Sequence, residues 1–168
     1  MEQRPRLIPL ESEAHEHRRY RRLLLPIFEP TAVARLQTGA EALAAEVLDE
    51  VLPTREFDFL WEAAKPISMG LFVRQLGLEP ERLDEFYAWE TGFYRAPTME
   101  ERIACGEKIG GYLFEVVTQH VDSPKDDIVD MLLNVDVEGE KLALEEVHAI
   151  CCLLFLASID TVATMLSF

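Results

Sequence analysis

The chain of 168 residues is 49% hydrophobic and carries a formal net charge of −15 at pH 7. This length allows one core of ordinary size and argues against two complete domains. The negative charge argues against a nucleic-acid partner, because affinity for phosphate backbones comes mainly from clustered Lys and Arg. The exception is residues 1–28, which hold six Arg against four Glu.

The cysteine content and the hydropathy pattern indicate a cellular compartment. Three cysteines, two of them adjacent at Cys151 and Cys152, do not make a disulfide framework and favour a reducing compartment. The longest uninterrupted apolar stretch is shorter than the ~20 residues of a membrane span. Met1-Glu2-Gln3-Arg4 does not open a signal peptide. We therefore expect a soluble cytoplasmic protein with no membrane partner.

Breakers and capping residues divide the chain into successive helices, so the predicted fold class is all-α. The first helix is expected from about Glu13 to Leu25, where Pro26 ends it, and the second from about Thr31 to Val51. Phe57-Asp58-Phe59 alternates apolar and polar residues, which would suit a short strand.

The middle of the chain continues the helical pattern. Helical spacing resumes from Trp61 to Leu76 and ends at Gly77. Pro80 opens the next helix, which is expected to reach about Tyr94. Thr98-Met99-Glu100-Glu101 forms a capping box, and the helix that it starts should reach about His120.

The last third of the chain is predicted to hold two more helices. Three glycines inside the preceding helix suggest close approach of another element or a local break: Gly106, Gly110 and Gly111. Ser123-Pro124 would begin a helix that runs to about Asn134, with Ser as cap. After a polar turn at 138–140, the last helix runs from Glu145 to the chain end. It is apolar nearly all round and should lie in the middle of the fold.

A basic cluster on the first helix is the first candidate site. His17 and Arg21 are four residues apart, so both lie on one face of the helix and could bind a pair of anionic oxygens. The alternative is a solvated basic face, which is the usual meaning of a charge run. Its position on a strongly acidic chain favours the anion site somewhat.

An acid and an alcohol on the last helix are the second candidate site. Asp160 and Thr161 follow an apolar run over 149–159 in which Ser158 is the one polar residue. A buried carboxylate costs several kcal/mol unless it is paired or protonated. Thr161 could bond the carbonyl one turn back, and Asp160 could relay protons. The alternative is a capped or partnered Asp at an interface. Ala157 and Ser158 would let a flat ligand lie close to the helix.

These motifs resemble those of one family. The stretch 13–23 (EAHEHRRYRRL) resembles "D-P-P-E-H-T-R-L-R-R-L" of bacterial-type cytochrome P450 haem-thiolate monooxygenases, and 157–161 (ASIDT) is similar to their oxygen-activation motif, "[A/G]-G-x-[D/E]-T". Between them, 64–66 with 76–78 resembles the family's Ala-x-Pro and Leu-Gly-Leu, and 126–133 its "D-D-L-x-x-x-L-L". The ordered series covers about residues 8–168.

The resemblance implies a cofactor and an activity. It implies that His17 and Arg21 hold the propionates of haem b, that Ala157 lies against the cofactor, and that Asp160 and Thr161 deliver protons during oxygen activation. The parent enzyme would insert one oxygen atom from dioxygen into a small organic substrate, using iron and external electrons.

The resemblance also implies roles for residues around the haem. Leu153 and Leu156 would line the substrate pocket. Trp89 and Phe93 would roof it, although aromatic residues at that spacing are more often core. The remaining arginines of the basic cluster would face an acidic ferredoxin-type electron donor, where complementary charge speeds encounter: Arg18, Arg19 and Arg22.

The sequence departs from the family pattern at several points. Ser158 stands where the family usually has Gly, and Leu144 where it usually has a Ser or Thr cap. The family's "E-x-x-R" helix and its iron-ligating Cys loop are not found, and the contexts of Cys105, Cys151 and Cys152 favour inert core thiols. We therefore expect a single partial domain over 1–168, truncated at both ends, with no metal ligand and no competence for oxygenation alone.

Other interpretations remain open. One is a non-catalytic helical remnant or interaction module that binds haem weakly or pairs with another chain, since removing both flanks would expose apolar faces. A purely structural acidic bundle is disfavoured by the Asp-Thr pair. The histidines lack cysteine or carboxylate neighbours at ligand spacing, which favours surface histidines over a zinc site: His15, His17, His120 and His148.

Overall fold

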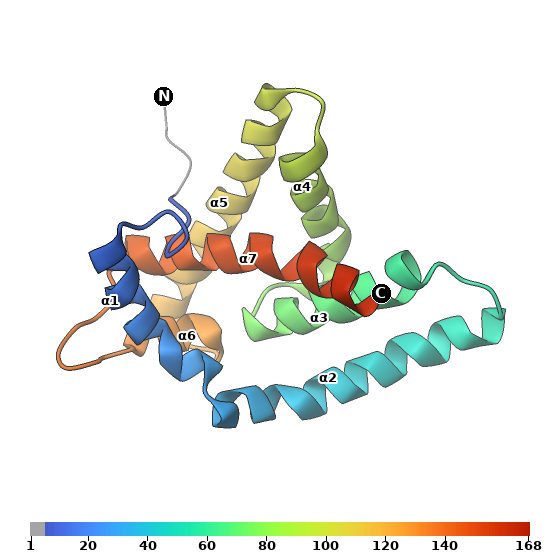
Figure 1. Cartoon of the computed structure of the whole chain (residues 1–168), viewed down its shortest axis with the longest axis horizontal. Coiled ribbons are helices and arrows are strands. Elements are labelled where there is room, and N and C mark those ends of the chain that lie inside the picture. Colours follow the sequence, from blue (N-terminus) through green and yellow to red (C-terminus); the bar gives the residue numbers. More distant parts are fainter. Residues whose placement is uncertain (1–5) are drawn as a thin grey trace.

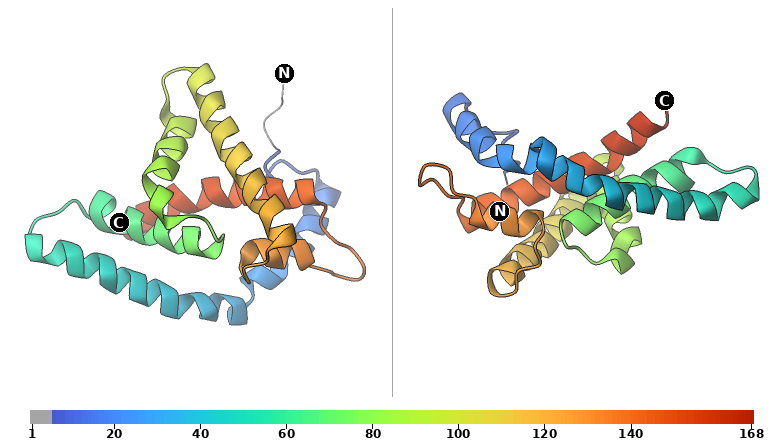
Figure 2. Two further views of the ribbon diagram at one scale, coloured as in Figure 1. Left: turned by 180° about the vertical axis from the view of Figure 1, so that it is seen from behind. Right: turned by 90° about the horizontal axis from the view of Figure 1, so that it is seen from below.

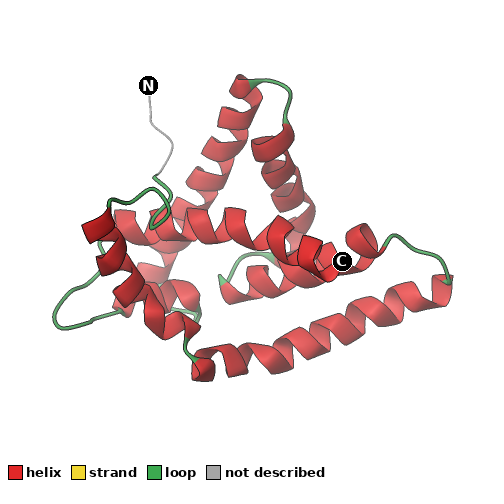
Figure 3. Cartoon of the chain, viewed as in Figure 1, coloured by secondary structure: helices red, strands yellow, loops and turns green. Residues whose placement is uncertain are grey.

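A computed structural model describes residues 6–168, apart from the side chain of Ile159. This part of the chain holds seven α-helices, which are α1 (Ala14–Leu24), α2 (Pro30–Val51), α3 (Lys65–Gln75), α4 (Leu83–Arg95), α5 (Met99–Asp122), α6 (Ile128–Asn134) and α7 (Leu144–Leu166). Short 3₁₀ turns cover Leu25–Phe28, Leu52–Thr54 and Pro80–Arg82. No strand occurs among the described residues, so the prediction of an all-α fold is confirmed (Figure 3).

Helix α7 crosses the centre of the molecule, as its all-round apolar sequence predicted (Figure 1). It packs against α3, α5 and α6. Helices α4 and α5 form an antiparallel pair on one side of it, and the long α2 runs along the other, beside α3 (Figure 2). Helix α1 lies near the first half of α7.

The core gathers around α7 because its side chains meet those of nearly every other helix. Phe155 of α7 is fully buried and makes edge-to-face contacts with Phe72 of α3 and Phe86 of α4, at centroid distances of 6.1 and 5.7 Å. Such aromatic pairs add about 0.5–1.5 kcal/mol to what burial of the ring contributes. The last residues of α7 emerge from the core, and Met165 and Leu166 are exposed.

Helix α7 is also the one described helix that is long and apolar enough to cross a membrane, with a mean hydropathy of 2.1 in its most apolar window. The sequence prediction counted only the uninterrupted apolar run, and the whole helix is longer than that run. This is weak evidence for a membrane span, since the core helix of a globular protein passes the same test. The contacts of α7 with α3, α5 and α6 give it such a core position.

The predicted strand at 57–59 is wrong, because Asp58 is a helix cap. Its Oδ1 accepts a hydrogen bond from Trp61 N at 3.0 Å, and its own N–H donates to Glu62 Oε1 at 2.6 Å. These bonds start a π-helical turn, η3 (Phe59–Ala64), in which Lys65 N bonds Leu60 O. Pro66 has no N–H to continue an α-helical ladder here, which accounts for the wider turn.

The start of α6 is also later than predicted. Ser123-Pro124 does not open the helix. Asp127 is the cap, with Oδ1 accepting from Val129 N at 2.9 Å and Asp130 N at 3.2 Å. The amides of 125 and 126 are already bonded to the Asp130 carboxylate, so those residues form a turn before the helix.

Several local predictions are confirmed. Thr98 and Glu101 form the capping box of α5, and Gly77 ends α3 with φ +60°. Gly106 marks a close approach, because a Cβ there would lie 3.3 Å from the Phe93 ring. Gly111 has open space around it, and α5 continues without a break. At the start of α7, Leu144 is the first helical residue and not the cap.

Candidate functional site

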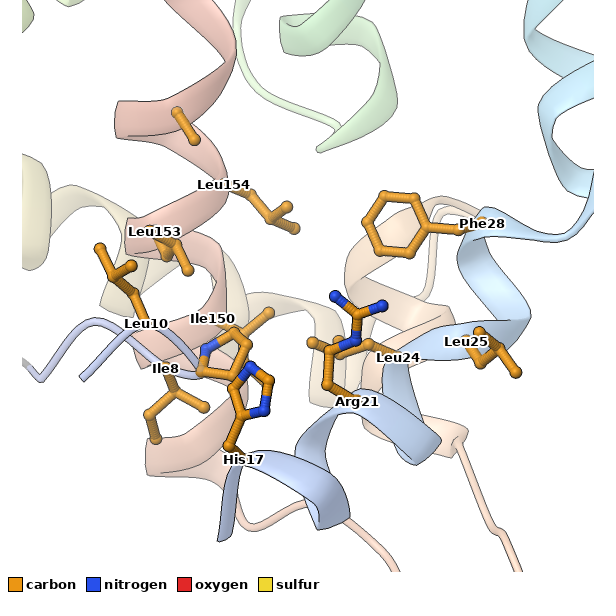
Figure 4. A pocket seen from close by; sticks show the side chains of 12 residues that line it. Ile8, Leu10, His17, Arg21, Leu24, Leu25, Phe28, Ile150, Leu153 and Leu154 are labelled. Carbon is orange, nitrogen blue, oxygen red and sulfur yellow. The ribbon is translucent and has the colours of Figure 1, made fainter. Parts of the chain in front are cut away.

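A largely apolar cavity of about 560 Å³ lies between α1 and α7 (Figure 4). One wall comes from α1 and the turn after it, the opposite wall from α7, and one edge from the segment before α1. The residues that line it are Ile8, Pro9, Leu10, His17, Arg21, Leu24, Leu25, Phe28, Ile150, Leu153, Leu154 and Ala157.

His17 and Arg21 are the charged or ionisable side chains of this lining. They lie one turn apart on α1 and face the cavity, where Figure 4 shows the Arg21 guanidinium between Leu154 and Phe28. Among residues 6–168, neither side chain takes part in an ion pair or a side-chain hydrogen bond, and both residues are exposed. The face that the sequence predicted therefore presents free donors to an apolar cavity.

The α7 wall is one helical stripe. Ile150, Leu153, Leu154 and Ala157 are spaced by three and four residues, so their side chains share a face. Thr161 is four residues beyond Ala157 and continues the stripe. The structure therefore brings the predicted residues His17, Arg21, Leu153 and Ala157 to one cavity, with Thr161 at the next turn.

The hydroxyl groups near this stripe bond back to their own helix. Thr161 Oγ1 donates to Ala157 O at 2.6 Å, as the sequence predicted, and Ser158 Oγ donates to Leu154 O. Ser68 Oγ of α3 donates to Ser158 O at 2.8 Å. The Ser158 hydroxyl is therefore accommodated inside a regular α-helix.

Asp160 is less buried than its apolar sequence context predicted. Its side chain is 38% exposed, because α7 leaves the core at this end, and Thr161 is exposed. Asp160 Oδ2 pairs with Arg95 Nη2 of α4 at 3.4 Å. The alternative of a partnered Asp between helices therefore describes its contact, and solvent screens the attraction in this half-exposed pair.

Beneath this pair lies an acid that the sequence reasoning missed. Glu90 of α4 is 3% exposed, and burial, with repulsion from Asp160, raises its pKa. The buried Lys65 opposes that shift. Lys65 Nζ also lies 3.8 Å from the centre of the Trp61 ring. The available sequence signal was the spacing of Glu90 four residues after Phe86, on the apolar face of α4.

Helix α1 is held to the start of α7 by ion pairs from its basic cluster. Arg19 Nη1 and Nη2 lie 2.7 and 3.3 Å from the two carboxylate oxygens of Glu146, and Tyr20 OH donates to the same group at 2.7 Å. Arg22 Nη2 donates to Glu140 Oε2 at 2.6 Å. Of the three arginines assigned to an electron donor, Arg18 alone makes no ion pair within the described part of the chain.

The remaining predicted pocket residues lie elsewhere. Leu156 is buried in the core, and Tyr94 OH donates to its carbonyl at 3.3 Å. Trp89 packs edge-to-face on Phe86 and Tyr112, and Phe93 lies against Gly106. The two aromatic residues thus take the core position that the sequence left open, and none of the three predicted residues lines the cavity.

The cysteines are buried or half-buried and stand apart from the cavity lining. Burial raises the pKa of Cys151, and it raises that of Cys152 to about 12, so both are protonated thiols at neutral pH. Cys152 Sγ lies 3.4 Å from His148 Nε2. The prediction of inert core thiols fits these two positions.

The surface assignment is wrong for His120, which is 1% exposed. The end of α5 and the start of α6 fold back on each other and place Asp127 beside the ring.

Nearly the whole chain is similar in sequence to proteins named as cytochrome P450 enzymes or monooxygenases. No family model matches it. It is 28% identical over 163 residues to the probable cytochrome P450 127A1 of Sinorhizobium fredii, covering 96% of this chain and 39% of that protein. It is 27% identical over 160 residues to the steroid C26-monooxygenase of Rhodococcus jostii, with 93% and 34% covered.

Solved structures share the fold. The crystal structure of the LnmA cytochrome P450 hydroxylase from the leinamycin biosynthetic pathway of Streptomyces atroolivaceus matches with a TM-score of 0.84 and 27% identity, over 92% of this chain and 40% of that one. The cytochrome P450 PksS of Bacillus subtilis matches with a TM-score of 0.87 and 23% identity, over 94% and 41%. The chain thus spans about 40% of the length of the proteins that it matches.

Proposed function

Because the chain belongs to the cytochrome P450 family and spans about 40% of the length of its relatives, we propose that it supplies the propionate-binding and proton-delivery parts of a haem-dependent monooxygenase. The substrate class is a small organic molecule, the cofactor is haem b, and the compartment is the cytoplasm.

The single observation that carries the proposal is a pair of donors at an apolar cavity, His17 and Arg21, whose side chains have no partner within the described part of the chain. Two cationic or neutral N–H donors one turn apart suit two carboxylates, and the apolar walls suit a flat hydrocarbon ring system. The residues present therefore fit the propionate edge and one face of a haem. His17 and Arg21 would bind the propionates, and Ala157 would leave room for the ring against α7.

Bound haem supplies the redox chemistry that activates dioxygen. The part of Asp160 and Thr161 is to hold and move protons. The Asp160 side chain is 38% exposed, so solvent reaches its carboxylate, and Arg95 Nη2 lies 3.4 Å from its Oδ2. The Thr161 hydroxyl donates to Ala157 O, and rotation about χ1 would release that proton toward the cavity side of the stripe.

The proposal also covers the residues that would contact the substrate and the electron donor. Leu153 is the predicted substrate contact that lines the cavity, whereas Leu156, Trp89 and Phe93 would act by shaping the core behind it. For an acidic ferredoxin-type donor, Arg18 offers an unpaired cation. Arg19 and Arg22 would contribute only the part of their charge that Glu146, Glu140 and Glu138 leave uncompensated.

The cysteines bear on whether the chain could hold a haem iron through a thiolate. No cysteine lies among the described residues that line the cavity, and the Cys151 and Cys152 thiols are protonated. In this family a cysteine thiolate would hold the haem iron and tune the chemistry that the haem supplies. We therefore propose that this chain alone does not oxygenate substrates. Haemin, reductant and carbon monoxide added to it should give no thiolate-type Soret band, and such a band would refute this assignment.

A haemin titration followed by tryptophan fluorescence and Soret absorbance tests the proposal. The double variant His17→Ala/Arg21→Ala should weaken haemin binding at least about ten-fold, because two charge-assisted hydrogen bonds are lost. A matched control removes one histidine and one arginine of the same helix outside the cavity lining, in His15→Ala/Arg18→Ala. The proposal fails if both double variants bind haemin as the wild type does, or if both lose it equally.

A second candidate function is supported by exposed apolar side chains. Several large ones lie around the cavity mouth and at the end of α7: Leu10, Leu25, Phe28, Met165, Leu166 and Phe168. Exposed apolar area of this kind drives association. A non-catalytic module that pairs with another chain would sediment as a concentration-dependent dimer or larger species, whereas a dilute monomer would argue against pairing.

A further inference from the structure

A second cluster of ligand-type side chains lies outside the cavity, where α5 ends and α6 begins. His120, Asp127 and Asp130 each place one potential ligand atom within 4.8 Å of the others. His120 and Asp130 are buried, with 1% and 8% of their surface exposed. Buried side chains of this kind differ from the acidic groups that gather on protein surfaces, because each must find a compensating partner.

The histidine ring has more acceptors around it than it can satisfy as a neutral group. His120 Nδ1 lies 2.7 Å from Val116 O, and Nε2 lies 2.8 Å from Asp127 Oδ2. Both neighbours are acceptors, and a neutral imidazole carries one N–H. The second contact therefore requires either another proton or a cation between Nε2 and the carboxylate.

Asp130 provides an independent observation. One of its oxygens, Oδ2, accepts hydrogen bonds from the amides of Lys125 and Asp126. The other, Oδ1, is buried and has no hydrogen-bond partner among residues 6–168. A buried carboxylate oxygen without a donor is rare in folded proteins and is one of the places where an ion is expected.

A separate cavity of about 270 Å³ reaches one member of the cluster, Asp127, which is part of its lining. Asp126, Asp127, Ile128 and Met131 line it from the α6 side, and Arg35 is the cation on the α2 side. Lys125 Nζ donates to Gly77 O at 2.9 Å, so a second cation lies on the side of the cluster that Gly77 forms. Among the described residues, the three carboxylates of Asp126, Asp127 and Asp130 therefore lie near two cations.

We propose that His120, Asp127 and Asp130 bind a divalent transition-metal cation of the Zn²⁺ type. The cation would lie between His120 Nε2 and Asp127 Oδ2, which are 2.8 Å apart, and within reach of the Asp130 carboxylate. Imidazole nitrogen and carboxylate oxygens are suitable ligands, at about 2.0–2.2 Å, with water in the fourth position. The Nε2 to Oδ2 separation of 2.8 Å would widen by roughly 0.5 Å to suit a tetrahedral ion.

The second ring nitrogen supports this geometry. Metal-bound histidines usually donate their other N–H to a carbonyl or carboxylate, which fixes the tautomer. Val116 O, one turn back on α5, provides that acceptor for Nδ1. Gly77 closes the remaining side, because a Cβ there would lie 2.1 Å from Asp127 Oδ2, so any larger residue would displace the ligand.

The test uses the whole chain, stripped with chelator and titrated with ZnCl₂ alone in a calorimeter. One equivalent should bind, with a heat of binding that saturates at a 1:1 ratio of Zn²⁺ to protein. About a hundred-fold excess of Zn²⁺ over its Kd should raise the unfolding temperature by roughly 5–10 °C. Absence of stoichiometric binding by the wild type would overturn the proposal without any variant.

Two variants and two controls locate the site. His120→Gln and Asp130→Asn should each weaken Zn²⁺ binding at least about ten-fold, with far-ultraviolet circular dichroism confirming that they are folded. The controls Asp122→Asn and His15→Gln remove an exposed acid and an exposed histidine outside the cluster, and binding should be unchanged. If His120→Gln binds Zn²⁺ like the wild type, or if the controls weaken binding as much as the two variants do, the cluster is a proton-bridged pair and the proposal is wrong.

Discussion

Replacement of Glu146 by Gln tests how α1, and with it His17 and Arg21, is held against α7. The Glu146 carboxylate accepts two hydrogen bonds from Arg19, one from Tyr20 OH and one from Ala143 N, at 2.7 to 3.3 Å. Gln keeps one acceptor oxygen, loses the charge and turns an NH₂ group toward donors. Because hydrogen bonds to charged groups contribute about 1.5–3 kcal/mol each when well shielded, the whole cluster outweighs an ordinary surface pair.

The expected cost is moderated by partial exposure. The Arg19 and Glu146 side chains are 32% and 22% exposed, so solvent screens part of their attraction. We expect Glu146→Gln to lower the free energy of unfolding by about 2–3 kcal/mol, which for a chain of this size corresponds to roughly 5–10 °C in Tm. Urea unfolding at pH 7, followed by circular dichroism, measures it.

The effect should depend on pH with a defined sign. Burial raises the pKa of Glu146, but the hydrogen bonds from Arg19, Ala143 N and Tyr20 outweigh it and hold that pKa below its usual range. A lowered carboxyl pKa stabilises the fold above the unfolded pKa of about 4.3, and that stabilisation is lost as the pH falls through the folded value. The difference between wild type and Glu146→Gln should therefore be full at pH 7 and shrink below about pH 4.

Glu145→Gln is the matched control, because Glu145 is the preceding residue of α7 and is exposed. It should change stability by no more than about 0.5 kcal/mol. If Glu146→Gln also falls within that range, or if both variants lose stability equally, the ion-pair cluster does not hold α1 in place and the reasoning is refuted.

Two further predictions concern packing. Phe155→Ala should lower the free energy of unfolding by about 3–5 kcal/mol, because the ring is fully buried between α3 and α4. The control Phe168→Ala removes a fully exposed ring and should lower it by less than about 0.5 kcal/mol. Equal losses in the two variants would contradict the central position of α7. Gly92→Ala should destabilise the wild type by about 1–2 kcal/mol, since the new Cβ would lie 2.4 Å from Cys105 Sγ. In a Cys105→Ala background, Gly92→Ala should instead stabilise the protein by up to about 1 kcal/mol, because Ala is a better helix former than Gly. Chemical denaturation of the wild type, the two single variants and the double variant measures this change of sign.

The helical parts of the fold could be predicted because their signals are local. Hydrophobic spacing, Pro26, Gly77 and the Thr98 capping box define ends that the structure shows within a residue or two. The wrong predictions of secondary structure arose where a side chain accepts hydrogen bonds from backbone amides several residues away. At Asp58 a cap replaces a strand, and at Asp130 a carboxylate takes the amides that a helix starting at 123 would use.

The parts of the candidate site that depend on local helical spacing could also be predicted. The four-residue spacing of His17 and Arg21 defines a helix face, and the stripe that contains Leu153 and Ala157 defines another; the fold then brings the two faces to one cavity. What could not be read was long-range charge pairing. Arg19 and Arg22 look like free cations in the sequence, but acids more than a hundred residues away neutralise them. The position of Glu90 on the apolar face of α4 was a local signal of burial, but its repulsion from Asp160 depends on the tertiary fold.

The two faces of α7 explain how one helix can serve both the core and a site. Val147, Cys151 and Phe155 are spaced by four and form the fully buried side, whereas Leu154 and Ala157 belong to the stripe that lines the cavity. Because the faces are distinct, substitutions on the first should change the free energy of unfolding, and those on the second should change ligand affinity with little loss of stability. Thr161 continues the cavity stripe at the end of α7 that leaves the core. The residue that carries the hydroxyl is therefore exposed to solvent, while the buried side of the same helix is packed in the core.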